Sequence, residues 1–546
     1  MPSSLTGGQL IVEALRIHGA DRVFTVPGES FLPVLDALHD APELQLTVCR
    51  QEGGAAMMAE ADGKLTGRPA VCLVTRGPGA TNAASGLHVA MQDATPLLLL
   101  IGQVGRGMQE REAFQEIDYR RLFGPLAKWV AQIDDPARIP ELLSRAFHTA
   151  TAGRPGPVVL ALPEDMLREH ALPVSVRPYR PVVPAPATAA MDALHGRLAA
   201  AQRPLVLAGG PGWDQTAVDH LVRFAEAWRL PVAAAFRRQD CFPNDHPGYI
   251  GDVGLGINPR LRERLRSADR LLVLGARLTE VETGGYTLLD LPRPAQTLIH
   301  VYPDPEELGR VYQPDLAICA GIAPFTEALA ALQPDVIPCW SDWTAAARSD
   351  YEHWNMPGAD PGTLQLGKII AWLRDYLPAD AILANGAGNY TLWLHRFYCY
   401  RRHATQLAPQ AGSMGYGLPA AIAAARRYPE RDVIAFAGDG CFQMTGQELA
   451  TAVQYRLKLV VVVVNNGLYG TIRMHQERRY PGRVVGTVLH NPDFVALARA
   501  CGARAERVTR PEEFAAAFEQ LRVCDGPGLL ELVLDPEILT PAVAAE

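Results

Sequence analysis

A carboxylate and an amide, each placed after an aliphatic run, are the residues of this chain best suited to chemistry. Asp439 lies in a Gly-Asp-Gly turn after VIAFA at 433–437, and Asn466 ends an Asn-Asn pair after LVVVVV at 459–464. Both runs predict buried parallel strands, and residues 445–456 have the helical periodicity and the length of one crossover. The two side chains should therefore share the carboxyl edge of one sheet, where open α/β sheets bind ligands. Carboxylate and amide oxygens suit Mg²⁺, which often carries phosphates. The alternative is that Asp439 and Asn466 belong to two ordinary turns that follow strands and bind no metal.

The composition is typical of a soluble globular protein with several domains. The chain has 546 residues, of which 48% are hydrophobic and 20% charged, so about three domains of ordinary size are expected. A net charge of −8 and the lack of basic blocks argue against a nucleic-acid surface, and no apolar run is long enough to span a membrane. The N-terminus has no basic region before its apolar residues, and the nine cysteines have no paired spacing. A cytoplasmic protein with reduced thiols is therefore expected.

Two proline-rich stretches, at 173–190 and 334–362, divide the chain into three segments. Each segment alternates strand-like and helix-like patterns. This predicts an α/β fold of three doubly wound, mainly parallel-sheet domains at 1–175, 190–335 and 360–546. The predicted strands lie at 22–26, 46–48, 70–75, 97–101 and 158–162 in the first segment, at 204–208, 231–235, 270–275 and 297–301 in the second, and at 381–384, 433–437, 459–464 and 528–533 in the third.

The Gly-Asp-Gly turn followed by the Asn-Asn pair resembles the diphosphate–magnesium motif of enzymes that use thiamine diphosphate (ThDP). Over essentially the whole chain, the layout of three α/β segments is similar to that of the superfamily of acetolactate synthase, pyruvate oxidase and pyruvate decarboxylase. The resemblance implies a pyrimidine-binding domain, a middle domain and a diphosphate-binding domain, in that order. It also implies that the side chains of Asp439 and Asn466 and the carbonyl oxygen of Leu468 bind Mg²⁺.

Glu52 is the residue that the resemblance implicates in activating the cofactor. The stretch RQEGGAA at 50–56 matches the family pattern R-H-E-x-x-A-A except at Gln51. In the family this glutamate lies against N1′ of the aminopyrimidine, where a shared proton promotes the imino tautomer that removes the C2 proton of the thiazolium. A dry site should strengthen that hydrogen bond. Without the resemblance, Glu52 is an ordinary first-turn carboxylate favoured by the helix dipole.

Three further motifs of the first segment resemble residues that line the family's site. TRGPGATN matches S-G-P-G-A-T-N apart from its arginine and so places Thr75 and Asn82 beside the cofactor, although Asn82 could simply cap a helix. Gln115, in AFQE, corresponds to a glutamine that faces the reacting carbon and could donate to a developing alkoxide; an exposed helical glutamine is the alternative. VPGES contains Pro27, a cofactor contact, and Glu29, at the step where pyruvate decarboxylases have a catalytic aspartate. Glu29 could shuttle protons if burial raised its pKa, or be a solvated turn carboxylate.

The third segment supplies the other residues expected at the cofactor. NGAGNY resembles the diphosphate-binding turn of the family, and GSMGYG is similar to G-T-M-G-F-G of the synthases. Met414 would be the bulky residue that forces the cofactor into its bent shape; the alternative is a core methionine. The resemblance implies further cofactor contacts from Gly388, Asn389, Tyr390, Gly412, Gly438, Gly440, Cys441, Tyr469 and Gly470.

Two positions depart from the synthase pattern in ways that bear on the substrate. Val281 stands where G-A-R-F-D-D-R ends in an arginine that grips the second keto acid, and His475 stands where Q-W-Q has its tryptophan. Loss of a bidentate carboxylate clamp should weaken a keto-acid acceptor. An aldehyde, a proton or another acceptor is therefore expected rather than standard acetolactate synthesis. His475 could serve acid–base catalysis or only fill the place of the tryptophan.

Together these features predict a ThDP- and Mg²⁺-dependent lyase or carboligase acting on a 2-oxo acid or a 2-hydroxy ketone (an acyloin). The resemblance implies a homodimer or homotetramer in which Glu52 of one subunit and Asp439 of another enclose the cofactor. FAD is the less favoured second cofactor, because the glycine turn at 208–212 is weak support and Tyr302 replaces an acidic residue of the flavin pattern. The alternatives are an FAD-containing pyruvate oxidase-type enzyme and a non-catalytic ThDP-binding relative.

Overall fold

The computed structural model describes residues 4–358 and 362–541. Within these ranges the chain forms three six-stranded sheets, in which every pairing is parallel, and one short antiparallel pair. The predicted α/β fold with three parallel-sheet domains is therefore confirmed. The domain limits 1–175, 190–335 and 360–546 stay predictions, because contacts group the chain in another way.

Two compact units interleave along the sequence. The first contains the chain up to Val182 together with Pro409–Pro429 and Gln443–Leu457, and the second contains Val183–Ala408, Glu430–Phe442 and the chain from Lys458 onward. The first sheet belongs to the first unit, and the middle and third sheets belong to the second. Two stretches of the third segment therefore pack with the first sheet.

The sheet of the first unit has the strand order β3-β2-β4-β5-β7-β6. Its strands are β2 (Arg22–Thr25), β3 (Gln45–Val48), β4 (Ala70–Val74), β5 (Leu97–Gln103), β6 (Trp129–Gln132) and β7 (Pro157–Pro163), and β1 (Leu5–Thr6) pairs with β8 (His170–Ala171). The helices of this unit are α1 (Gly7–Ile17), α2 (Leu32–His39), α3 (Glu52–Thr66), α4 (Pro78–Asp93), α5 (Tyr119–Phe123), α6 (Ile139–Thr151), α14 (Gly417–Arg427) and α16 (Leu449–Gln454).

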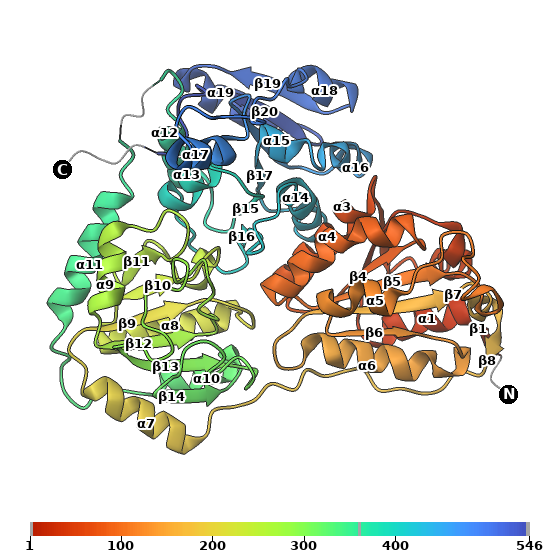
Figure 1. Cartoon of the computed structure of the whole chain (residues 1–546), viewed down its shortest axis with the longest axis horizontal. Helices are drawn as coiled ribbons and strands as arrows, with labels where there is room; N and C mark the ends of the chain where they lie inside the picture. Colours follow the sequence, from red (N-terminus) through yellow and green to blue (C-terminus); the bar gives the residue numbers. More distant parts are fainter. Residues whose placement is uncertain (1–3, 359–361, 542–546) are drawn as a thin grey trace. The chain divides into compact units, whose positions relative to one another are not determined.

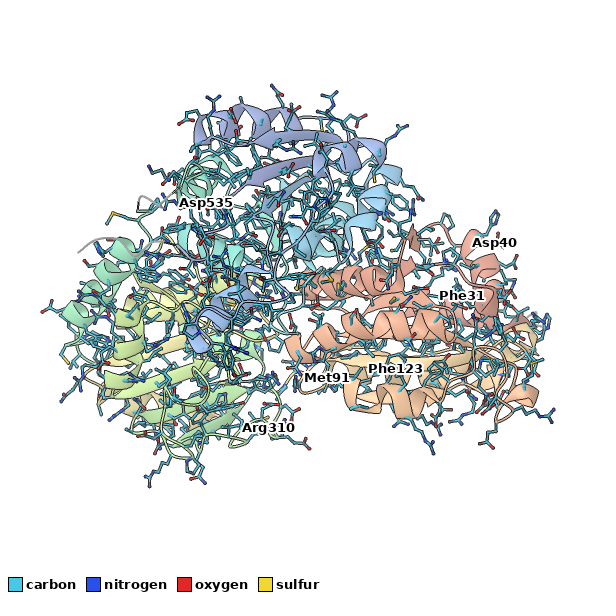
Figure 2. All side chains as sticks on the ribbon, turned by 45° about the horizontal axis from the view of Figure 1, so that its top comes forward. Phe31, Asp40, Met91, Phe123, Arg310 and Asp535 are labelled. Atoms are coloured by element: carbon cyan, nitrogen blue, oxygen red, sulfur yellow. The ribbon has the colours of Figure 1, made fainter. Side chains whose placement is uncertain are left out.

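Alternation along the central strands gives this sheet two apolar faces. Alternate strand residues such as Val71, Leu98 and Val158 share one core with α1, α2 and α6, while α3 and α4 cover the opposite face (Figure 1). Phe31 and Phe123 are fully buried, whereas the Asp40 side chain is exposed (Figure 2).

Small residues make α3 a helix that is buried on nearly every side. Most of its alanines and glycines are buried, and α4 and α14 both pack against it. A side chain at Gly86 of α4 would place its Cβ 2.5 Å from the Cβ of Ala56, so glycine is required for the two helices to approach this closely. The close packing fixes the first residue of α3, which is Glu52.

The middle sheet has the strand order β11-β10-β9-β12-β13-β14. Its strands are β9 (Pro204–Ala208), β10 (Val232–Ala234), β11 (Tyr249–Asp252), β12 (Arg270–Leu274), β13 (Thr297–Tyr302) and β14 (Leu316–Cys319), and its helices are α7 (Thr188–Ala199), α8 (Gln215–Trp228), α9 (Pro259–Ser267), α10 (Ile322–Ala330) and α11 (Ser341–Trp354). Val206 and Leu272 pack on one face with α7, α8 and α10, and Leu205 and Leu271 pack on the other face with α9. Both faces are thus covered, as expected of a parallel sheet.

The third sheet has the strand order β16-β15-β17-β18-β20-β19. Its strands are β15 (Ile382–Asn385), β16 (Gln406–Leu407), β17 (Val433–Gly438), β18 (Val460–Asn465), β19 (Arg504–Val508) and β20 (Gly528–Val533), and its helices are α12 (Leu366–Tyr376), α13 (Tyr390–Phe397), α15 (Asp439–Phe442), α17 (Gly470–Arg479), α18 (Phe494–Ala500) and α19 (Pro511–Arg522). The two strands predicted to precede Asp439 and Asn466 are β17 and β18, and they are parallel neighbours. The predicted single crossover helix is instead a 3₁₀ turn followed by the short α16.

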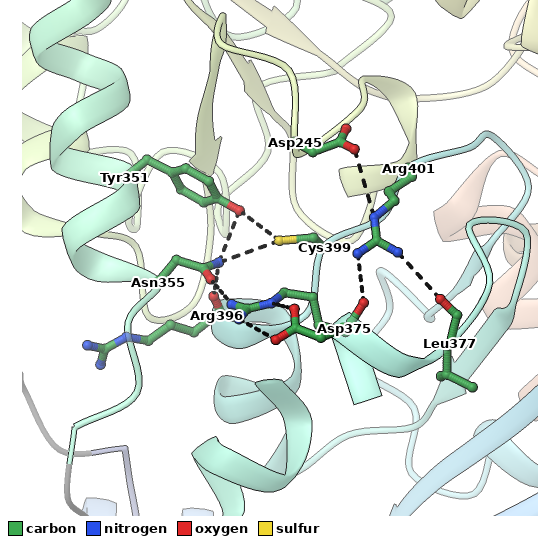
Figure 3. Close-up of polar contacts among 9 residues, drawn as sticks. Asp245, Tyr351, Asn355, Asp375, Leu377, Arg396, Cys399 and Arg401 are labelled. Carbon is green, nitrogen blue, oxygen red and sulfur yellow. Dashed lines mark hydrogen bonds and ion pairs between the residues drawn. The ribbon is translucent and has the colours of Figure 1, made fainter. Parts of the chain in front are cut away.

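The helix α11 is joined to the third sheet's helices by a polar cluster inside the second unit (Figure 3). Asn355 caps α11, and its amide donates to the carbonyl oxygen of Arg396 at 2.7 Å and to the hydroxyl of Tyr351 at 3.0 Å. Arg374 of α12 donates to Oδ1 of Asn355 at 2.8 Å. The stretch after the middle sheet is therefore anchored to α12 and α13.

Candidate active site

Asp439 lies at the carboxyl end of β17, directly beside the end of β18. Gly438 pairs with Val464 in the parallel register, so Asp439 and Asn465 stand at the same level of the sheet edge. The carboxylate of Asp439 is buried, with the residue 2% exposed. It accepts hydrogen bonds from the backbone N–H of Gly440 and of Gly467, both at 2.9 Å. The predicted meeting of the two strand ends at one edge is present.

Asn491 joins the two strand ends, and sequence reasoning missed it. Its Nδ2 donates to Oδ2 of Asp439 at 2.7 Å and to Oδ1 of Asn465 at 2.9 Å. Oδ1 of Asn465 also accepts a hydrogen bond from the N–H of Gly467 at 3.2 Å, and Nδ2 of Asn465 donates to Glu531 at 2.7 Å. The sequence signal for Asn465 was present in the Asn-Asn pair, whereas nothing near Asn491 distinguishes it from a loop asparagine.

The groups around Asp439 fit a divalent cation. Burial raises the pKa of Asp439, and the three hydrogen bonds to it come from neutral donors that oppose this shift. A buried carboxylate with neutral partners gains from a nearby cation. No group of three or more His, Cys, Asp or Glu residues able to bind a metal occurs in the described ranges, so a metal here would depend on amide and carbonyl oxygens beside the single carboxylate.

The residues that follow β18 form a tight turn into α17. Asn466 accepts the N–H of Leu468 at 3.3 Å, and the N–H of Tyr469 donates to the carbonyl of Thr487 at 2.8 Å. A side chain at Gly440 would place its Cβ 2.5 Å from the ring of Tyr469, so this glycine permits the two turns to touch. Gly470 begins α17. Gly467, which donates its N–H to Asp439, lies between the predicted ligands Asn466 and Leu468, and the metal role of these two residues stays a prediction.

The turn before α13 places Tyr390 under the end of β17. The Tyr390 hydroxyl accepts the N–H of Gly386 at 3.0 Å, donates to the carbonyl of Phe436 at 3.2 Å and lies 3.6 Å from the sulfur of Cys441. Its ring lies 3.3 Å from where a Cβ at Gly438 would be. The hydroxyl is therefore engaged within the protein, and Tyr390 would contact a cofactor through its ring.

Asn389 is tied to elements on both sides of the same turn. Its Nδ2 donates to the carbonyl of Leu539 at 2.7 Å, and its Oδ1 accepts the hydroxyl of Thr471 at 2.8 Å. Thr471 lies in α17, one residue after Gly470. Gly388 has a φ of 143°, which a side chain would disfavour. The residues predicted to bind the diphosphate therefore cluster around the ends of β15, β17 and β18.

Glu52 occupies the first position of α3 in the first unit. Gln51 caps the helix by accepting the N–H of Gly54 at 3.0 Å, which gives a local purpose to its departure from the family histidine. The amide of Asn82 in α4 donates to Oε2 of Glu52 at 2.9 Å. Asn82 is thus a partner of the predicted catalytic carboxylate and not a helix cap. A side chain at Gly79 would place its Cβ 3.1 Å from Oε1 of Glu52, so the first turn of α4 approaches the carboxylate closely.

Arg76, the residue by which TRGPGATN departs from the synthase pattern, pairs with Glu29. Arg76, which is 8% exposed, donates to Glu29 at 3.2 Å and to the carbonyl of Phe114 at 3.3 Å. The Glu29 side chain is 70% exposed, so Glu29 is not the buried carboxylate that a proton shuttle at this turn would require. Pro27 and Thr75 flank this pair in sequence, and Thr75 contacts the hydroxyl of Ser30 at 2.9 Å. The catalytic role of Glu29 stays a prediction.

Gln115 lies in a turn and not in a helix, so the alternative of an exposed helical glutamine is wrong. Its φ of 65° is in the left-handed region. A Cβ at Gly77 would lie 2.8 Å from the Cβ of Gln115, and the N–H of Gly77 donates to the hydroxyl of Tyr119 at 3.1 Å. Phe114 beside it is 73% exposed. Gln115 is thus placed against the loop that contains Thr75 and Gly77 and leads into α4.

Met414 lies in a loop of the first unit and is half-buried, unlike a core methionine. The backbone N–H groups of Gln410 and Ala411 donate to Asp93 at 3.0 and 3.2 Å. The hydroxyl of Tyr416 donates to Glu60 at 2.5 Å. Side chains of α3 and α4 therefore fix the loop on both sides of Met414 and of the exposed Gly412.

A buried ionic cluster connects these side chains, and the sequence analysis did not find it. Nζ of Lys64 lies 2.5 Å from Asp93 and 3.1 Å from Glu60, and the side chains of these three residues are 7%, 1% and 0% exposed. Burial raises the pKa of Glu60, and Lys64 opposes that shift. Glu60 and Lys64 are four residues apart on α3, a spacing that could have indicated a pair.

Replacing Lys64 with methionine should destabilise the first unit by about 3–5 kcal/mol, because it leaves two buried carboxylates without their cation. The measurement is the thermal midpoint of unfolding in the full chain. Arg16 is a matched control, since it also contacts two carboxylates, Glu13 and Glu43, but its side chain is 50% exposed. Arg16→Met should cost less than about 1 kcal/mol. Equal midpoints for the two variants would contradict a stabilising role for the buried cluster.

Two predicted residues are not linked to these groups by any described contact. His475 is exposed on α17, and Val281 is half-buried in the loop after β12. Val281 lines a cavity of about 100 Å³ together with Arg262 and Arg266 of α9. The cavity beside Val281 is thus lined by two guanidinium groups and by the carboxylate of Glu282, although position 281 itself lacks an arginine.

In the described ranges, no helix combines the length and the apolar character required to cross a bilayer.

Comparison with known proteins identifies the three sheets. Residues 5–122 match the N-terminal TPP binding domain of thiamine pyrophosphate (that is, ThDP) enzymes, residues 191–331 match the central domain, and residues 386–532 match the C-terminal TPP binding domain. The chain is 32% identical to the acetolactate synthase large subunit of Corynebacterium glutamicum, covering 100% of this chain and 89% of that protein. It is 31% identical to the acetolactate synthase isozyme 2 large subunit of Escherichia coli, covering 97% and 96%. A probable acetolactate synthase large subunit of Methanocaldococcus jannaschii is 31% identical, covering 99% and 93%. The chain therefore belongs to the ThDP-dependent enzymes of the acetolactate synthase family, whose members are enzymes of the carboligase and decarboxylase type.

Proposed function

We propose that this enzyme uses ThDP and Mg²⁺ to split or join the carbon–carbon bond next to the carbonyl of a 2-oxo acid or an acyloin. The observation that carries the proposal is the edge formed by β17 and β18, where the buried Asp439 meets Asn465 through Asn491. In the first unit, Glu52 with its partner Asn82 supplies the carboxylate that such an enzyme requires.

The residues of the chain would divide the work between them. Asp439, Asn466 and the carbonyl of Leu468 would bind Mg²⁺, and the turns before α13 and after β17 would bind the diphosphate. Glu52 would share a proton with the aminopyrimidine, and Met414 would support the bent cofactor. The bound cofactor supplies a carbon nucleophile that the side chains of the protein lack. Gln115 could donate to the oxygen of the substrate.

The direct test is cofactor-dependent turnover. Protein freed of metal and cofactor with a chelator should release no CO₂ from pyruvate, and ThDP with Mg²⁺ added together should restore release. Aromatic 2-oxo acids and acyloins extend the screen if pyruvate is not a substrate. If no 2-oxo acid or acyloin gave ThDP-dependent product, the catalytic proposal would fail and a non-catalytic ThDP-binding protein would replace it.

The acceptor is the part of the reaction on which two observations differ. The relatives compared above are named acetolactate synthase, and these names give no support to an acceptor other than a keto acid. Val281, however, removes the family arginine, while Arg262 and Arg266 lie around the same cavity. We propose that these two arginines leave keto-acid binding weakened but not abolished.

Val281→Arg should therefore raise kcat/KM for a keto-acid acceptor by about tenfold or more, the effect expected of one added charge-assisted hydrogen bond. The measurement is the ratio of acetolactate to acyloin formed when pyruvate competes with an aldehyde. Val281→Met adds a long side chain without charge and should leave the ratio unchanged. The same shift in both variants would assign the effect to size.

A visible absorption spectrum of the purified protein tests the flavin alternative. We expect no stoichiometric flavin band, because Tyr302 is fully buried within β13, where the family's flavin pattern has an acidic residue. A flavin band at one equivalent per chain would instead favour an FAD-containing enzyme of the pyruvate oxidase type.

We further propose a homo-oligomer in which Glu52 and Asp439 of one site come from different subunits. Co-expression of Glu52→Gln chains with Asp439→Asn chains tests this, because mixed oligomers would then contain some sites with both native residues. Random assembly should restore about a quarter of wild-type activity. Activity no higher than that of either variant alone would place both residues of a site in one chain.

A further inference from the structure

Glu448 is a fully buried carboxylate to which the site described above assigns no task. It is 0% exposed and lies between a 3₁₀ turn and α16, in the connection from β17 to β18. This connection, Gln443–Leu457, belongs to the first unit, and so does Glu52. Glu448 and Glu52 therefore lie in the same compact unit.

The Glu448 carboxylate binds the backbone that leads into α3. Its Oε1 accepts the N–H of Arg50 at 3.0 Å and the N–H of Gln51 at 2.9 Å. Its Oε2 lies 3.2 Å from the N–H of Arg50 and accepts the hydroxyl of Thr451 at 2.7 Å. The two bound N–H groups are those of the residues immediately before Glu52. The carboxylate thus fixes two consecutive peptide units at the entrance to the helix.

The first turn of α3 leaves room for the Glu448 side chain at Gly54. A side chain at Gly54 would put its Cβ 2.7 Å from Oε1 of Glu448. Glycine at this position therefore allows the carboxylate to lie across the first turn of α3. Two neighbours of Glu448 secure the same stretch: Gln454 accepts from the guanidinium of Arg50 at 2.6 Å, and the hydroxyl of Tyr455 accepts the N–H of Val48 at 2.8 Å.

We propose that Glu448 is a positioning residue that sets the direction of the Glu52 side chain. A residue at the first position of a helix takes its orientation from the backbone just before it, and Glu448 fixes that backbone by charge-assisted hydrogen bonds. The proposal rests on the proposed role of Glu52. It means that the connection from β17 to β18 also orients the carboxylate of Glu52, the residue proposed to activate the cofactor.

The test compares three variants of the full-length enzyme loaded with ThDP and Mg²⁺. Glu448→Ala removes both acceptors, Glu448→Gln keeps one carbonyl oxygen for the two N–H groups, and Tyr455→Phe removes the hydrogen bond to Val48, four residues before Glu52. We expect Glu448→Ala to lower kcat by about tenfold to a hundredfold with little change in the KM for ThDP, as for a misplaced catalytic group. Glu448→Gln and Tyr455→Phe should stay within about threefold of wild type.

Hydrogen–deuterium exchange of the peptide containing Arg50 and Gln51 supplies a readout that does not depend on activity. Exchange there should speed up in Glu448→Ala and not in Glu448→Gln. The proposal is overturned if Glu448→Ala keeps wild-type kcat, or if Tyr455→Phe loses as much kcat as Glu448→Ala. It is also overturned if Glu448→Gln is as inactive as Glu448→Ala, because that result would assign the carboxyl proton a direct role. If the wild type lacked ThDP-dependent turnover, the exchange experiment would still decide whether Glu448 fixes this backbone, so the two failures are distinguishable.

Discussion

Replacing Glu52 with glutamine is expected to lower kcat by about a hundredfold to ten-thousandfold, the usual contribution of a positioned acid or base. Glutamine has the same size and can still accept the hydrogen bond from Asn82 to Oε2, so the fold and the helix start should be unchanged. What the variant loses is the negative charge that would attract the proton of the aminopyrimidine nitrogen. ThDP should still bind, because Glu52 is distinct from the residues proposed to bind the diphosphate.

Steady-state kinetics measure the expected loss of kcat, and a ThDP binding titration measures whether ThDP binding is retained. Glu141→Gln is a matched control, because Glu141 is also a first-turn carboxylate, on α6 of the same unit, and its side chain is 62% exposed. If Glu52→Gln were no more harmful to kcat than Glu141→Gln, Glu52 would be an ordinary helix-dipole residue.

Asp439→Asn is expected to weaken ThDP binding strongly. Loss of a residue that only supports a metal ligand typically lowers metal affinity by about 10–100-fold, and loss of Asp439 should cost more than this. The change removes the negative charge of the Asp439 side chain, and it replaces one acceptor oxygen with an NH₂ group. That group would face the N–H of Gly440 or the N–H of Gly467, both of which now donate to Asp439. Mg²⁺ and ThDP binding should fall together, because in the proposed site the cation would be held by the carboxylate of Asp439 and would carry the diphosphate.

Isothermal titration of ThDP at fixed Mg²⁺, repeated without Mg²⁺, checks this expectation. Asp432→Asn is the control, because Asp432 lies just before the opposite end of β17, where its carboxylate pairs with Arg522 at 3.2 Å. That variant should bind ThDP as the wild type does. If Asp439→Asn bound ThDP normally in the presence of Mg²⁺, the metal would have to lie elsewhere.

The sequence allowed the sheet edge to be predicted because its causes are local. Buried parallel strands require continuous apolar runs, and β17 and β18 consist of such runs within one residue of the predicted limits. Residues at the ends of adjacent parallel strands must then meet, which is why Asp439 could be placed beside the Asn-Asn pair before any coordinates.

The supporting contacts could not be predicted because their causes are distant in sequence. Glu448 binds the N–H of Gln51 across 397 positions, and Asn491 reaches Asp439 across 52. Backbone N–H groups occur at every residue and carry no side-chain signature, so no motif marks the one that a buried carboxylate will bind. The pairing of Arg76 with Glu29 could not be predicted either, because the two residues are 47 positions apart and no motif joins them.

The interleaving of the two compact units has a consequence for how the chain matures during synthesis. The ribosome completes the first sheet and α3 long before Tyr416, which binds Glu60 across 356 positions, has been made. Until then the buried charges of α3 lack part of their partners, and the face that α14 will cover is open to water. The nascent first domain should therefore remain incompletely folded and depend on chaperones until translation passes residue 457. A released fragment ending at Val182 should accordingly be degraded or aggregate, whereas the complete chain folds.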